Sequence, residues 1–149
     1  MQMLKRIALF SALVAACCLM ATADEPGRHP YYLHALTDLR DARAQLDRLT
    51  PSDRLNDQEE RAIAEIDAAI REIKHAAIDD GKNVGDHMPV DAHMKRTDRY
   101  HRALELLDKA RHDIKHEEDN PESRGLQHRA LEHIEQAHDT IEHIVHNME

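Results

Sequence analysis

Four stretches of the chain share one apolar pattern, A-[LI]-x-x-[LI]-x-x-A-x-x-x-[LI], and this repeat constrains the fold more than any other feature. The copies begin at Ala35, Ala62, Ala103 and Ala130. Their apolar positions fall on one face of an α-helix, because a turn takes about 3.6 residues. The pattern therefore predicts four amphipathic helices. It arises either by duplication of a helical hairpin or because bundle helices in general converge on this spacing.

Turn and capping residues between the copies define the expected helices. We expect them over residues 30–49, 57–78, 94–118 and 121–147. Pro30 and Pro121 suit the first position of a helix, and Asn56 with Glu59 resembles a capping box. Short connections between helices of similar length favour antiparallel neighbours. The sequence thus predicts an all-α, antiparallel up-and-down four-helix bundle that forms a single domain over residues 24–149.

Residues 1–23 have the composition of a secretory signal peptide. Lys5 and Arg6 precede an apolar run, and residues 21–23 form a small-x-small cleavage site. The run is shorter than the roughly 20 residues that cross a bilayer, and no other stretch approaches this length. We therefore expect a periplasmic or secreted protein without a transmembrane helix. The alternative is cleavage before Cys17 and acylation of that cysteine, which would give a lipoprotein.

Charge and residue usage exclude several classes of function. The chain has 20 Lys and Arg against 29 Asp and Glu, and no basic cluster that could bind nucleic acid by displacing counterions. Both cysteines lie within the expected signal peptide, so we expect no disulfide or reactive thiol in the mature domain. The sequence has no glycine-rich phosphate loop either. We therefore expect a protein that is not an enzyme.

The unusual count is 13 histidines. In the third expected helix, an exposed stripe opposite the buried face contains His101, Glu105, Asp108, His112 and His116. The last two are four residues apart, so their rings can converge on one ion, and nearby carboxylates suit Zn(II), Ni(II) or Cu(II). The fourth helix repeats the stripe with His128, Glu132, Asp139, His143 and His146. The alternative is a solvated face without a ligand.

A second candidate site follows from the alternating helix directions, which would bring many histidines to one end of the bundle. That group comprises His29, His34, His75, His87, His93, His143 and His146, with Asp79, Asp80, Asp86 and Asp91. Within the long connection, the candidate ligands are His87, His93 and Asp86. Aspartates at this point also suit a helix exit. His138 flanks the core, and we expect it to be a packing residue rather than a ligand.

Three segments carry a family resemblance. They read HPYYLHALTDLRDAR at residues 29–43, AAIDDGK at residues 76–82 and EEDNPESRG at residues 117–125. Together they resemble a family of exported, all-helical bacterial proteins of uncharacterised function. The resemblance implies export and a helical fold, but it supplies no activity, cofactor or site residue.

Three functions fit these features. The first is an exported, histidine-rich protein that weakly binds or buffers transition-metal ions in the cell envelope. The second is a structural or protein-interaction module of the envelope, or a self-associating one. Its candidate apolar contacts are Tyr31, Tyr32, Leu33 and Met94. The third is an acid-responsive bundle, because ordinary histidines titrate near a pKa of about 6.5.

Overall fold

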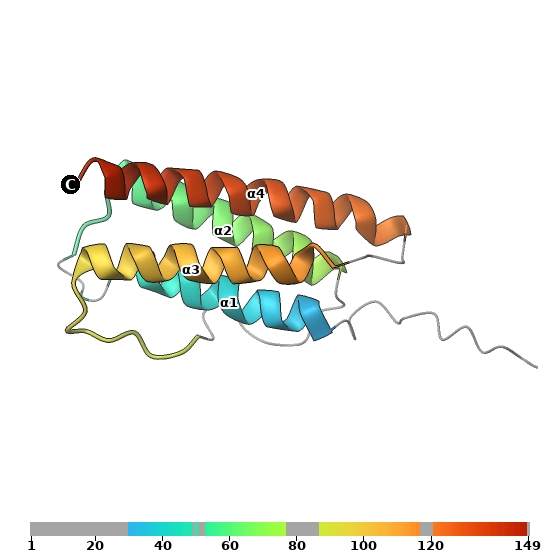
Figure 1. Cartoon of the computed structure of the whole chain (residues 1–149), viewed down its shortest axis with the longest axis horizontal. Coiled ribbons are helices and arrows are strands. Elements are labelled where there is room, and N and C mark those ends of the chain that lie inside the picture. The colour runs from blue at the N-terminus through green and yellow to red at the C-terminus, as the bar shows by residue number, and fades with distance from the viewer. Residues whose placement is uncertain (1–29, 49, 51–52, 77–86, 117–120, 149) are drawn as a thin grey trace, which may run out of the picture.

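The computed structural model describes residues 30–48, 50, 53–76, 87–116 and 121–148, and the expected signal peptide lies outside them. The described residues form four helices and no strand (Figure 1). The predicted all-α four-helix bundle is confirmed. The helices are α1 (Pro30–Leu46), α2 (Asp57–Ala76), α3 (Arg96–Ile114) and α4 (Pro121–His146).

The helices pack in two close pairs. α1 lies against α3 and α2 lies against α4, with lighter contacts between α1 and α2 and between α3 and α4. Neighbouring helices are antiparallel (Figure 1). The start of α2 lies beside the start of α3, because Arg96 Nε donates a hydrogen bond of 2.7 Å to Glu59 Oε1. α2 and α3 therefore run in the same direction.

This direction of α3 corrects the expected alternation, since the helices run up, down, down and up. The connection between α2 and α3, residues 77–95, permits this direction, and its residues 87–95 are described. A chain of that length reaches about 60 Å when extended, which is twice the roughly 30 Å length of α2. It can therefore return to the other end of the bundle. On the way, Met88 N donates to Asp41 Oδ1 of α1 at 2.8 Å.

The alanines of the repeated pattern lie at the centre of the core. All eight are fully buried: Ala35, Ala42, Ala62, Ala69, Ala103, Ala110, Ala130 and Ala137. Small side chains let the helix backbones approach closely, and the isoleucines and leucines of each copy fill the remaining space. Leu104 and Leu131, expected to point inward, are only partly buried and pack at the edge of this core.

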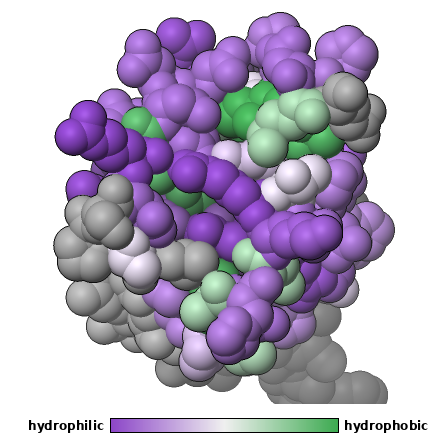
Figure 2. All heavy atoms as spheres, turned by 90° about the vertical axis from the view of Figure 1, so that its left-hand side faces the viewer, coloured by the Kyte–Doolittle hydropathy of each residue, from purple (hydrophilic) through white to green (hydrophobic). Residues whose placement is uncertain are grey.

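The apolar residues expected to contact a partner, Tyr31, Tyr32, Leu33 and Met94, do not form a large exposed apolar area in the described part of the chain. Tyr32 is 3% exposed and belongs to the core. Among the residues described, the exposed large hydrophobic side chains are those of Tyr31, Met88 and Met148. Where α2 and α3 begin, Figure 2 shows a mostly hydrophilic surface with small, separate hydrophobic areas. Over the described ranges, none of the helices is both long enough and apolar enough to cross a membrane.

Candidate functional site

Two of the expected histidines converge at the end of α3. His112, Asp113 and His116 each offer a ligand atom, and these three atoms lie within 4.8 Å of one another. The two imidazole rings meet edge to face, with centroids 5.5 Å apart. His112 is exposed, whereas Asp113 and His116 are half-buried. Two imidazoles and one carboxylate, all within residues 112–116, can thus coordinate a single ion.

Two neighbouring helices hold His116 in this cluster. Gln127 Nε2 of α4 donates to the carbonyl oxygens of Ile114 and His116, at 2.5 and 2.8 Å. These bonds satisfy carbonyl groups that the helix end leaves without partners, and α3 accordingly ends at Ile114, before the expected residue 118. From α1, the Tyr31 ring stacks on the His116 imidazole with centroids 3.8 Å apart.

A surface hollow of about 430 Å³ adjoins the cluster and is rich in carboxylates. Its lining residues are Asp38, Asp108, Lys109, His112 and Asp113. Burial raises the pKa of the Asp38 carboxyl above its ordinary value; Lys109 opposes this shift and Asp113 adds to it. Two carboxylates that repel each other gain from a nearby cation. The residues that line the hollow thus include three aspartates and one lysine beside His112.

The rest of the expected α3 stripe does not join this cluster. Glu105 forms an ion pair with Arg102 at 2.8 Å, and Asp108 forms one with Arg111 at 2.6 Å. His101 lies near the start of α3, and the 15 positions to His116 correspond to about 22 Å along a helix. A single ion cannot span that distance. The predicted five-residue stripe therefore reduces to its C-terminal histidine pair.

The predicted histidine-rich end of the bundle is wrong because α3 runs in the unexpected direction. His34 near the start of α1 and His75 at the end of α2 lie at one end. His93 before α3 and His143 near the end of α4 lie at the other. His29, Asp79, Asp80 and Asp86 fall outside the described residues.

The candidate ligands in the α2–α3 connection are exposed where they are described. His87 Nδ1 lies 2.7 Å from the backbone oxygen of Met88, its neighbour in the chain. His93 N donates to Asp91 Oδ1 at 2.8 Å, which is a local turn contact. Among the residues that the structure describes, neither His87 nor His93 belongs to a group of three possible ligand atoms within 4.8 Å of one another.

A second group of possible ligands lies between α3 and α4. His138 Nε2 is 3.7 Å from Asp108 Oδ1, and its Nδ1 is 3.8 Å from Glu142 Oε1. Asp139 completes a set with His138 and Glu142 whose ligand atoms lie within 4.8 Å of one another. His138 was expected to be a packing residue. Its side chain is half-buried, but a carboxylate lies near each of its two ring nitrogens. With one imidazole, this group is a weaker transition-metal ligand set than the pair on α3.

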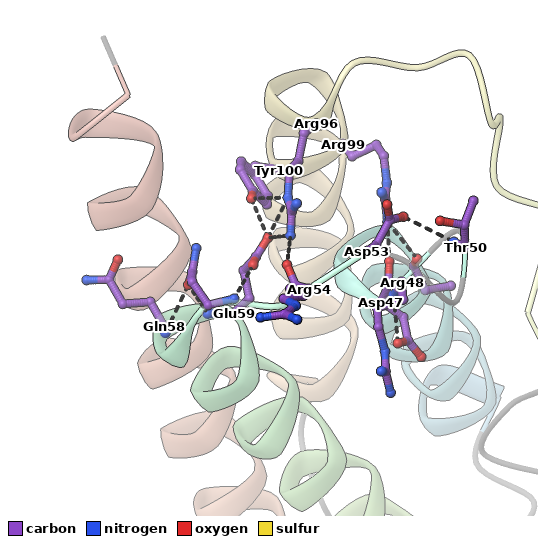
Figure 3. A network of polar contacts seen from close by, with 12 residues as sticks. Asp47, Arg48, Thr50, Asp53, Arg54, Gln58, Glu59, Arg96, Arg99 and Tyr100 are labelled. Carbon is purple, nitrogen blue, oxygen red and sulfur yellow. Dashed lines mark hydrogen bonds and ion pairs between the residues drawn. The ribbon is translucent and has the colours of Figure 1, made fainter.

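At the end of the bundle where α2 and α3 begin, a buried polar cluster connects these two helices. The sequence did not predict this cluster. Figure 3 shows the fully buried Glu59 between Tyr100 and Arg96. Its carboxylate accepts hydrogen bonds from Tyr100 Oη, from Arg96 Nε and from Asn56 N. Burial and the Glu59 carboxylate raise the pKa of Tyr100 to about 12. The only sequence signal was the capping-box glutamate, which predicts a local bond but not its partners on α3.

The fold and the cluster together define a four-helix bundle with a histidine pair and a carboxylate at the end of α3. Comparisons with protein-family models, with curated proteins and with solved structures give no match in any of the three. The resemblance to exported helical proteins stays a prediction.

Proposed function

We propose that the protein binds a divalent transition-metal ion through His112, Asp113 and His116 and acts in the cell envelope as a weak metal binder or buffer. The supporting observation is the convergence of three ligand atoms within 4.8 Å. Imidazole nitrogens suit Zn(II), Cu(II) and Ni(II), whereas Ca(II) and Mg(II) prefer oxygen ligands. Three protein ligands on one short segment leave positions for water, which is consistent with a weak, exchangeable site.

The acidity of the surroundings supports the same proposal. Asp38 and Asp113 place negative charge beside the histidine pair, and Lys109 is the cation among the residues that line the hollow. A divalent ion would reduce the repulsion between these carboxylates. Metal binding requires neutral imidazoles, so acid should release the ion. The site would therefore hold metal at neutral pH and lose it in an acidified envelope.

Calorimetric titration of the purified protein with Zn(II), Cu(II) or Ni(II) at pH 7.5 and pH 5.5 tests the proposal. We expect saturable binding at pH 7.5 that disappears at pH 5.5, because protons compete with the metal ion for the imidazole nitrogens. Replacing both His112 and His116 by Ala should abolish the saturable binding. Asp113→Asn should weaken it by about tenfold, in the range observed when groups around a metal are lost.

The matched control replaces two exposed histidines that lie away from the cluster, His101 and His146, by Ala. This control should bind like the wild type. In all of these proteins, wild type included, Cys17 and Cys18 are changed to Ser, so that thiols cannot take up the metal. Absence of saturable binding in the wild type, or an equal loss in the control, would refute the proposal.

A further inference from the structure

The stacked rings of Tyr31 and His116 connect the candidate ligand group, which is His112, Asp113 and His116, to the first turn of α1. The two rings are nearly parallel, with an angle of 19° between their planes and centroids 3.8 Å apart. We propose that Tyr31 is a positioning residue, which orients the His116 imidazole for coordination and couples metal binding to the docking of α1 on α3. This inference rests on the proposed metal site.

His116 needs such support because it lies beyond the last residue of α3. Its backbone N–H makes a long bond of 3.4 Å to Asp113 O, and its carbonyl is held by Gln127 from α4. Neither contact restricts rotation of the imidazole ring about its own side-chain bonds. The Tyr31 ring lies against one face of the imidazole and limits that rotation. The ring is therefore held before any ion arrives, which lowers the ordering cost of coordination.

Stacking and coordination use different parts of the imidazole. A metal ion binds a ring nitrogen through its lone pair, which lies in the ring plane, whereas Tyr31 covers a face. The His112 ring meets the His116 ring edge to face, at 79°, so it leaves the Tyr31 contact in place. Tyr31 and an ion can therefore contact His116 at the same time.

Coordination should also strengthen the stack. A bound cation withdraws electron density from the imidazole, and an electron-rich phenol face attracts a more positive ring. By linkage, a contact that strengthens when metal binds must raise metal affinity to the same extent. The start of α1 would then dock more firmly on the end of α3 in the metal-bound protein than in the free protein.

The test is an NMR-monitored titration of the full chain with Zn(II), using wild type, Tyr31→Phe and Tyr31→Leu. Without metal, a stacked ring should shift the His116 ring protons upfield in wild type and Tyr31→Phe but not in Tyr31→Leu. We expect Tyr31→Phe to bind Zn(II) like the wild type and Tyr31→Leu to bind it about tenfold more weakly. Thr37→Ala, an exposed change on α1, is the control and should alter neither property.

The outcomes separate this inference from the proposed function. If wild-type protein shows no saturable Zn(II) binding, both fail. If binding depends on His112 but Tyr31→Leu binds as tightly as wild type, the positioning role of Tyr31 alone is overturned. A second measurement needs no variant: Zn(II) should shift the Tyr31 ring resonances of the wild type at saturation. Unchanged Tyr31 resonances in the metal-loaded protein would refute the coupling.

Discussion

At the scale of single residues, the Glu59 carboxylate shows how the bundle tolerates a buried charge. Oε1 accepts hydrogen bonds from Tyr100 and Arg96, and Oε2 accepts one from Asn56 N at 2.7 Å. A buried carboxylate without partners is strongly destabilising, whereas one with several donors is tolerated. Arg99 lies nearby and donates to Asp47 O at the end of α1, at 2.6 Å (Figure 3). These contacts tie the end of α1 to the starts of α2 and α3.

Removing the Tyr100 hydroxyl should therefore be costly. Tyr100→Phe keeps the buried ring but takes a donor from Glu59, and we expect it to lower the free energy of unfolding at pH 7 by about 1–3 kcal/mol. Urea denaturation followed by circular dichroism measures this loss. The control is Tyr31→Phe, which changes a tyrosine that is 38% exposed and should have little effect on unfolding. An equal midpoint for Tyr100→Phe and wild type would contradict the structural role of the cluster.

The same tyrosine predicts how stability depends on alkaline pH. Its pKa is raised from 10.0 to about 12, so the folded state favours the neutral phenol. A raised pKa contributes stability that is complete below the unfolded value, and this contribution is lost as pH rises through the folded value. Wild-type stability should thus fall between about pH 10 and pH 12, and Tyr100→Phe should lack this part of the decrease. Parallel stability curves for the two proteins would show that Tyr100 does not carry the effect.

At the scale of the helix, the start of α2 is held by the predicted capping box, which is confirmed. Asn56 Oδ1 accepts hydrogen bonds from the N–H groups of Gln58 and Glu59, at 3.0 and 2.8 Å. Glu59 returns a bond by accepting from Asn56 N. The motif was predictable because all its donors and acceptors lie within three residues. The same glutamate also binds α3, so the cap of one helix contributes to contact with another.

Asn56→Ala should remove the cap and lower the free energy of unfolding by about 0.5–2 kcal/mol. Asn56→Ser, which keeps an acceptor oxygen, should recover much of this loss. Asn147→Ala is the matched control, because Asn147 is exposed beyond the end of α4. The measurement is the urea midpoint of each variant. A value for Asn56→Ala that matches Asn147→Ala would show that the cap contributes no stability.

At the scale of the whole molecule, the direction of α3 decides which residues share an end of the bundle. α4 runs antiparallel to α2. Arg129 of α4 forms an ion pair with Glu72 of α2 at 2.8 Å, and His133 Nδ1 lies within hydrogen-bond distance of Glu65 Oε2, at 2.7 Å. α3 in turn runs antiparallel to α1, which brings Tyr31 to His116. With α3 reversed, the end of α3 would lie far from Tyr31. The candidate site therefore depends on the order of helix directions.

Distances between spin labels should report this order directly. We expect labels at Arg61 and His101, exposed and near the starts of α2 and α3, to lie closer together than labels at Arg61 and Lys115. Positions 101 and 115 are separated by about 21 Å along a helix. Cys17 and Cys18 would be changed to Ser, so that only the introduced cysteines carry labels. Strictly alternating helices would give the reverse order of the two distances.

The features that sequence alone determined are local in the chain. These features are helix formation, the burial of the repeated alanines and the α2 cap. Each depends on side chains within one or two helical turns, so the apolar period and the capping residues can be read from the sequence. The spacing of His112 and His116 belongs to the same class, since residues four apart on a helix are neighbours. Asp113 follows His112 directly but lies about 100° around the helix, so wheel reasoning placed it outside the stripe.

Tertiary structure alone decided the contacts between residues far apart in the sequence. The α2–α3 connection is long enough for either direction of α3, so hydrophobic periodicity could not distinguish them. That direction brings Glu59 to Tyr100 and Tyr31 to His116, and it separates the histidines expected to share one end. An amphipathic face specifies that a helix must be buried, but it does not specify which helix covers it, because apolar contact is not directional.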